Sequence, residues 1–303
     1  MNRVVATTLA LALSGCIADL DPASYVSDAR PLAARVSIAS DPERAQPLPG
    51  ETFTLRWLIA SPGDRPALAW GFVACPAVAT SIGETFCVGD AVGFSLQEEP
   101  IDAEPEIEVT VPADTEVDRV LVLGVLCAGG SPVVDLDAAE VGCTEPSGET
   151  LVQVIVRLAE DAASANQHPT VPDDAVRLAG EVWSATAADV PSDDCASAPV
   201  PQASVAAGAV TIAFVLPDAA RETYATERGE AREELAIAQA ATAKSFPRLL
   251  SVVDDIDPEA NVDFTPEPVD PPPPGGARVK FFFVVRDDRG GVTFTERALC
   301  LVP

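Results

Sequence analysis

The chain has 303 residues, a length that favours two domains, and its 48% hydrophobic and 22% charged residues are typical of folded proteins rather than disordered ones. Its 19 Lys and Arg stand against 47 Asp and Glu, which gives a formal net charge of -28. Phosphate groups would repel such a chain, so nucleic acid is excluded as a general partner. The single His argues against His-based catalysis and against zinc chemistry.

The first 16 residues, MNRVVATTLALALSGC, have the parts of an export signal. Arg3 gives a basic start, an apolar run extends from Val4 to Leu13, and small residues precede Cys16. This run is too short to span a bilayer, which requires about 20 apolar residues. An ordinary cleaved signal peptide and a buried strand are two possible interpretations of this segment, and a lipoprotein signal is the third.

The tetrapeptide Leu13-Ser14-Gly15-Cys16 resembles the bacterial lipobox, which implies that residues 1–15 are a signal peptide and that Cys16 is lipidated. Ile17 follows Cys16 where inner-membrane lipoproteins have Asp, and the resemblance therefore implies delivery to the outer membrane. Residues 16–31 are mostly polar, contain Pro and lack periodicity, so we expect a lipidated tether.

Alternating apolar and polar residues predict a β-sandwich for residues 32–160. In ETFTLRWLIA, Phe53, Leu55, Trp57 and Ile59 share one face, as in a half-buried strand. RVLVLGVLC is apolar on both faces and is expected to be a central strand. Other strands are expected in ALAWGFVAC, TFCVGDAVGFSL, EIEVTVP and ETLVQVIVRL. About seven short strands without a credible helix indicate an immunoglobulin-like sandwich.

The small polar residues 161–174 are predicted to be a linker, and residues 175–303 a second sandwich. Strands are expected there in AVRLAGEVW, GAVTIAFVLP, RVKFFFVVR and GVTFTERALCLV. Residues 219–245 are ambiguous, and we expect a loop or short helix leading into a strand. The predicted fold is thus all-β, with two immunoglobulin-like β-sandwich domains in tandem after a signal peptide and short tether.

Two segments, PLPGETFTLRWLIASP with a nearby Cys and VVRDDRGGVTFTERALCLV, resemble two-domain lipoproteins of myxobacterial type, whose domains look immunoglobulin-like. The resemblance implies a fold and an envelope location. It implies no activity and no catalytic residue.

Six cysteines remain besides Cys16, which predicts disulfides in an exported protein. In a Greek-key sandwich the third and sixth strands are antiparallel neighbours. Cys75 and Cys127 each end one of these strands, so they lie at opposite ends of the sandwich and cannot bond. We therefore expect Cys75–Cys87 and Cys127–Cys143, each closing one loop.

In the second domain, Cys195 lies in the connection after the first predicted strand and Cys300 lies near the end of the last. First and last strands of such sandwiches run parallel and close together. The expected third disulfide is therefore Cys195–Cys300, which closes a long loop.

The acidic segment DDIDPEANVDF is the candidate metal site, with side-chain oxygens on Asp254, Asp255, Asp257, Asn261 and Asp263. Calcium takes six to eight oxygens, which such a loop can supply. The EF-hand pattern fails, however, because its Gly and its last Glu are missing. A solvated acidic loop is the preferred interpretation and calcium binding is the alternative; no other cofactor is expected.

Motifs for catalysis are scarce. His168 is the only imidazole, and its place in NQHPT predicts a solvated linker residue. The acids between Glu98 and Glu108 are expected to be a solvated strand face and loop. Trp57 and Trp70 lie on apolar strand faces and are expected in the core, whereas Trp183 is the better candidate for a surface ring that stacks on a sugar.

The function expected from these observations is non-enzymatic: a lipid-anchored cell-envelope protein with a binding, adhesion or structural role. One alternative is a calcium- or carbohydrate-binding module. A second is a carboxylate-only hydrolase, which requires two acids in a concave pocket and a raised pKa on one of them. The expected partners are the membrane, through the lipid anchor, and envelope proteins or polysaccharide. The expected location is the outer membrane, on either its periplasmic or its surface face.

Overall fold

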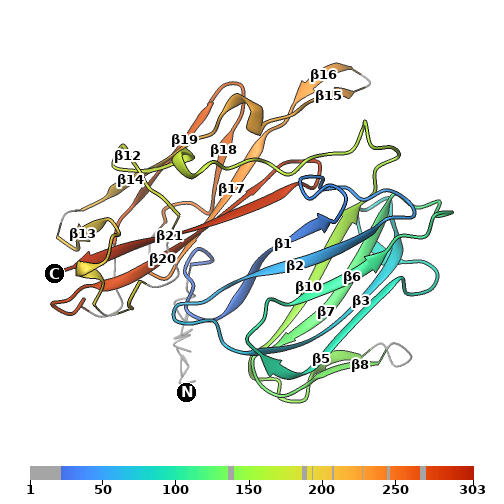
Figure 1. The fold of residues 1–303 in the computed structure, drawn as a ribbon, viewed down its shortest axis with the longest axis horizontal. Coiled ribbons are helices and arrows are strands. Elements are labelled where there is room, and N and C mark those ends of the chain that lie inside the picture. The colour runs from blue at the N-terminus through green and yellow to red at the C-terminus, as the bar shows by residue number, and fades with distance from the viewer. Residues whose placement is uncertain are drawn as a thin grey trace, which may run out of the picture.

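The computed structural model describes residues 22–135, 140–185, 190–192, 194–206, 208–226, 228–243, 246–266 and 271–303. Within these ranges the regular secondary structure is nearly all strand, and the strands form two β-sandwiches that lie side by side (Figure 1), as the sequence predicts. Three single-turn 3-10 segments, Asp173–Ala175, Cys195–Ser197 and Asp218–Ala220, are its helices there. None of the described helices has the length and apolar character to cross a membrane. Cys16 and the predicted signal lie outside the described residues.

Two antiparallel sheets form the first sandwich. One sheet contains, in spatial order, β1 (Arg30–Ile38), β2 (Thr52–Ala60) and β6 (Glu106–Thr110). The other contains β10 (Glu149–Arg157), β7 (Arg119–Cys127), β3 (Leu68–Ala79) and β4 (Thr85–Cys87), with β5 (Gly93–Ile101) also paired to β3. A small hairpin joins β8 (Pro132–Asp135) to β9 (Glu140–Cys143). The predicted alternation in β2 fills the core, where Trp57 stacks on Phe72 with ring centroids 4.1 Å apart.

The second sandwich has a four-stranded and a five-stranded sheet. The first contains, in spatial order, β12 (Glu181–Val182), β11 (Val176–Leu178), β14 (Val210–Val215) and β19 (Glu259–Phe264). The second contains β13 (Gln202–Ser204), β21 (Val292–Val302), β20 (Ala277–Arg286), β17 (Leu235–Ala241) and β18 (Leu250–Val253). A separate hairpin, β15 (Thr223–Thr226) and β16 (Gly229–Arg232), projects from one end of this sandwich (Figure 1).

The segment AVRLAGEVW is a tight hairpin rather than the single strand that its alternation predicts. Ala179 and Gly180 have φ angles of 51° and 89°, the left-handed conformations of a two-residue turn between β11 and β12. The reversal returns Trp183 to the core, where it is 1% exposed and its Nε1 donates to the Ala298 carbonyl at 3.0 Å. The prediction that Trp183 is a surface ring is therefore wrong.

The ambiguous residues 219–245 contain a hairpin followed by the strand β17. Their Ala, Glu and Arg content favours a helix, but Gly229 adopts a φ of 120° and the chain pairs with itself from Thr223 to Arg232. The strand that follows was predicted from the alternation in LAIAQA, and it pairs with both β18 and β20.

Three consecutive phenylalanines in β20 face two different apolar clusters. Phe281 and Phe283 point into the core of the second sandwich. Phe282 points the other way because side chains alternate along a strand, and it packs against Val26 and Ala60. The interface between the sandwiches is thus apolar at this point.

The described part of the predicted tether is packed against the second sandwich. The Val26 N–H donates to the Ala241 carbonyl at 2.8 Å, and the Ala241 N–H donates to the Ser24 carbonyl at 2.8 Å. Both Ser24 and Val26 are buried, and β1 already begins at Arg30. Residues 24–31 are therefore part of the folded body rather than a free tether.

The three disulfides are those that the sequence predicts: Cys75–Cys87, Cys127–Cys143 and Cys195–Cys300. In the antiparallel register of β3 and β7, Cys127 lies opposite Ala69 and Cys75 opposite Leu121, so the two cysteines are at opposite ends. The reason given for the third pair needs correction. The strand that runs parallel to β21 is β13, not the first strand of the sandwich, and β13 begins shortly after Cys195.

We predict that removing the long-range disulfide destabilises the protein more than removing a short one. In the chain-entropy model, Cys195–Cys300 with its separation of 105 residues contributes about 4–5 kcal/mol, and Cys75–Cys87 with a separation of 12 contributes about 3 kcal/mol. Urea unfolding of the paired Cys→Ala variants measures both losses. A larger loss for the Cys75→Ala/Cys87→Ala protein would contradict the prediction.

Candidate functional site at the junction of the two domains

The segment predicted to be a solvated linker is built into the junction. His168 is only 4% exposed. The backbone N–H of Val292 donates to its Nδ1 at 3.0 Å, so the proton of the neutral ring is on Nε2, which donates to the Val36 carbonyl at 2.8 Å. The imidazole thus joins β1 of one sandwich to β21 of the other, and the prediction of a solvated His168 is wrong.

The protonation state of His168 follows from its surroundings. Burial and the nearby Arg35 lower its pKa to about 4, against the opposing effect of the hydrogen bond to Val36. At neutral pH the ring is therefore uncharged, and both of its nitrogens are engaged with backbone groups. This arrangement suits a structural bridge between domains rather than a catalytic base.

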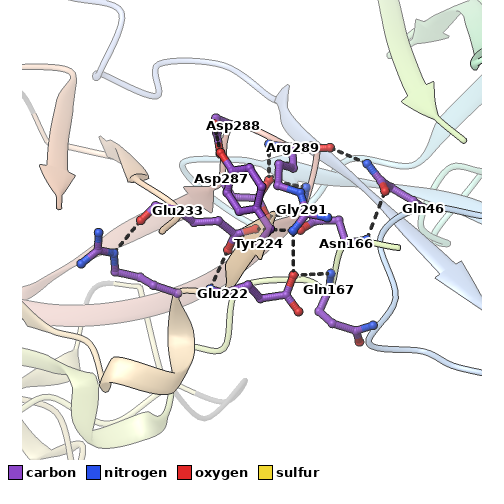
Figure 2. A network of polar contacts seen from close by, with 12 residues as sticks. Gln46, Asn166, Gln167, Glu222, Tyr224, Glu233, Asp287, Asp288, Arg289 and Gly291 are labelled. Atoms are coloured by element: carbon purple, nitrogen blue, oxygen red, sulfur yellow. Dashed lines mark hydrogen bonds and ion pairs between the residues drawn. The ribbon is translucent and has the colours of Figure 1, made fainter. Parts of the chain in front are cut away.

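The turn between β20 and β21 forms the centre of the junction (Figure 2). One oxygen of Asp287 accepts the backbone N–H groups of Arg289, Gly290 and Gly291 at 2.7–2.8 Å. Gly290 has a φ of 108°, which side chains rarely tolerate. Asp287 therefore fixes the shape of the hairpin turn between β20 and β21.

The other oxygen of Asp287 reaches the linker. It accepts a hydrogen bond from Nδ2 of Asn166 at 2.9 Å, and the N–H of Asn166 donates to Oε1 of Gln46 at 3.1 Å. Nε2 of Gln46 donates to the carbonyl of Arg289 at 2.9 Å. These bonds form a closed ring through the first sandwich, the linker and the second sandwich (Figure 2).

The side chain of Arg289 organises the projecting hairpin. Its Nη1 lies 3.1 Å from Oε2 of Glu222 and 3.4 Å from Oε1 of Glu233, and its Nη2 donates to the Ser164 carbonyl at 3.0 Å. The guanidinium also lies over the ring of Tyr224, 4.6 Å from its centroid. The hydroxyl of Tyr224 donates to Asp288 at 3.2 Å.

A polar groove of about 730 Å³ opens beside Arg289, between the linker and the hairpin. Asp161, Ser164 and Ala165 line one wall, and Glu222 and Tyr224 line the other. Its volume is within the range of small-molecule sites. This groove brings the ionisable groups of Asp161, Glu222 and Arg289 together with the ring of Tyr224, at a surface formed by the linker and the second sandwich.

Two acids converge on Arg289, but only one of them faces the groove. Burial raises the pKa of Glu233 to about 7, and the hydrogen bond from the Glu222 N–H opposes this effect. Glu233 is 1% exposed, whereas Glu222 lines the groove. Because the acid with the raised pKa lies out of reach of a molecule in the groove, the pair lacks the geometry that a carboxylate hydrolase requires.

The predicted calcium ligands are not brought together. Asp254 accepts the N–H groups of Ile256 and Asp257 at 2.7 Å each, which lowers its pKa and closes the turn between β18 and β19. Asp255 pairs with Arg221 at 2.9 Å. Asp263 accepts the hydroxyl of Thr211 at 2.7 Å.

Asn261, like Asp263, lies on the exposed face of β19, away from the turn. In the described ranges no three His, Cys, Asp or Glu side chains are arranged to hold a metal ion. The calcium alternative at this segment is therefore unsupported, because the carboxylates of Asp254, Asp255 and Asp263 each have a separate hydrogen-bond or ion-pair partner.

Other predicted positions agree with the sequence analysis. Ile107 and Val109 of β6 are buried while Glu106 and Glu108 are exposed, as expected of a solvated strand face. Trp57 and Trp70 are buried in the first core.

The groove residues around Arg289, by contrast, were not predicted. They come from three segments that are more than 50 residues apart along the chain, and no local motif marks them.

No family model matches the sequence, and no curated protein matches it. Among solved structures, the crystal structure of red sea bream transglutaminase matches at 11% identity with a TM-score of 0.21. The match covers 92% of this chain and 32% of that chain, so this chain spans less than two thirds of the transglutaminase. A likeness this weak says nothing about activity.

We predict that His168 makes the protein less stable in acid. Its folded pKa of about 4 is below the unfolded value of 6.5, so the unfolded state binds more protons between these pH values and stability falls as the pH falls through them. The measured quantity is the difference in free energy of unfolding between the wild type and His168→Gln. We expect this difference to decrease by about 3 kcal/mol as the pH is lowered from 6.5 to 4. Urea unfolding at each pH measures it, and a constant difference would contradict the prediction.

We predict that Arg289→Ala destabilises the protein by about 1–2 kcal/mol at pH 8, because the buried Glu233 carboxyl loses its cation and must then take up a proton. The loss should be smaller at pH 5, where Glu233 is protonated in the folded state, and Glu233→Gln in the same chain should recover part of it. Arg56→Ala, which breaks an exposed pair with Glu106, is the control and should cost less than about 1 kcal/mol. A pH-independent loss would exclude Glu233 as the cause.

Proposed function

We propose that this chain is a lipid-anchored protein of the cell envelope, held at the outer membrane through Cys16, with a non-enzymatic binding, adhesion or structural role. Three disulfides within an all-β fold support an oxidising location outside the cytoplasm. The lipobox-like tetrapeptide supports the anchor.

The observation that carries the non-enzymatic part is the use of the polar residues at the junction. His168 and Asn166 connect backbone and side chains of both sandwiches, and Arg289 holds the projecting hairpin through Glu222 and Glu233. Every one of these groups fixes the orientation of one segment relative to another. We infer that the two sandwiches act as one rigid body that presents the groove and the hairpin to a partner.

The partner we propose is an envelope protein or a polysaccharide. The groove offers the carboxylates of Asp161 and Glu222 as hydrogen-bond acceptors beside Tyr224. Hydroxyl and amide donors match these acceptors, whereas the net charge of -28 disfavours anionic ligands.

The test of the anchor uses fractionation and metabolic labelling in a Gram-negative host. Because the acidic body is repelled by anionic lipids, acyl chains and not charge should hold it: detergent should release the wild type, and high salt should not. Palmitate should label the wild type and the control Ser14→Ala, which keeps a small residue before the cut, but not Cys16→Ala. Equal label on Cys16→Ala, or release by salt alone, would contradict the proposal.

A further inference from the structure

An apolar pocket of about 280 Å³ lies on the outer face of the five-stranded sheet of the second sandwich. Side chains alternate along β17 and β20, so that Ala238 and Phe282 point outward while their neighbours fill the core. Leu250 of the edge strand β18 and Leu32 of the first sandwich complete the pocket walls, together with Ala23. The lining is almost entirely hydrocarbon.

The mouth of this pocket is also apolar. Leu249 and Leu250 line it and are 48% and 53% exposed, which leaves large hydrocarbon side chains in water at the edge of the sheet. Such a concave apolar surface is typical of a site for a hydrocarbon ligand.

The N-terminal segment is fixed at the same place. Two backbone hydrogen bonds tie Ser24 and Val26 to Ala241, and Nη2 of Arg30 donates to the carbonyl of Ala23 at 2.5 Å. The chain between Cys16 and the body therefore starts at the wall of the pocket rather than at an arbitrary point on the surface. A tether that only had to separate the body from a membrane would not require this attachment.

We propose that the pocket binds an acyl chain carried by Cys16 of the same molecule whenever the protein is off the membrane. This inference rests on the proposed lipid anchor. Cys16 precedes Ala23 by seven residues, which extend to at most about 24 Å, so the acyl chain can reach the pocket. An apolar cavity of about 150 Å³ binds benzene, and this pocket of about 280 Å³ therefore holds a substantial part of a fatty chain.

A bilayer is the other candidate to cover Leu249 and Leu250. The turn that follows β18 carries Asp254, Asp255 and Asp257, at the end of the strand opposite Leu250. Anionic headgroups would repel these carboxylates, which favours an acyl chain of the protein itself over the membrane surface.

The experiment uses the full chain, labelled in cells with a palmitate analogue that carries a photoreactive diazirine. The protein is extracted in detergent, transferred to detergent-free buffer and illuminated, and the crosslinked peptides are mapped by mass spectrometry. We expect crosslinks within one molecule from Cys16 to peptides of β17, β18 or β20. Ala238→Phe fills the pocket and should reduce these crosslinks at least tenfold, whereas Ala236→Phe, on the same face of β17 but outside the pocket, should leave them unchanged.

The outcomes separate the two proposals. Absence of the analogue from Cys16 overturns the lipid anchor. If Cys16 carries the analogue but crosslinks form only between molecules or to residual lipid, the pocket is not the binding site of the acyl chain. Crosslinks that Ala238→Phe does not reduce would overturn the pocket proposal in the same way. Equal thermal melting of the two Phe variants shows that a loss of crosslinks comes from the filled pocket and not from unfolding.

Discussion

The carboxylate of Asp287 is the constraint on which the junction of the two sandwiches depends. One of its oxygens accepts three backbone N–H groups and fixes the β20–β21 turn, and the other accepts a hydrogen bond from Asn166 of the linker. The fixed turn then directs Arg289 toward Glu222 and Glu233, which position the projecting hairpin. A single side chain thereby couples the linker, the hairpin and the orientation of the domains.

Burial makes this junction sensitive to pH in two opposite ways. The lowered pKa of His168 removes stability as the pH falls from 6.5 toward 4. The raised pKa of Glu233, about 7 against an ordinary value of 4.5, removes stability as the pH rises between these values. His168 joins the two domains, whereas Glu233 lies beside the junction and contacts Arg289 and Glu222 of the second domain.

The second sandwich connects the junction to the N-terminal segment. Phe282 contacts Val26 and Ala60 on one face of β20, while Phe281 on the other face packs in the core. The same sheet therefore stabilises the second domain, joins it to the first and holds the segment that leads to Cys16. Movement of residues 24–31 would require disruption of buried apolar contacts, and this is the physical reason to regard them as part of the folded body.

The sequence alone determined the strands with strong alternation, such as β2 and β6, because they follow from local periodicity. It also determined the Cys75–Cys87 and Cys127–Cys143 disulfides, because the opposite directions of β3 and β7 separate Cys75 from Cys127. Cys195–Cys300 was predicted correctly but from the wrong neighbour, since the strand parallel to β21 is β13. The sequence mistook Trp183 for a surface residue, since the left-handed residues Ala179 and Gly180 reverse the chain without changing its hydrophobic pattern. Only the tertiary structure decided that His168 bridges the domains and that Glu233 is buried behind Arg289. These contacts join residues far apart in the chain, and burial, which sets their pKa values, has no signature in local sequence.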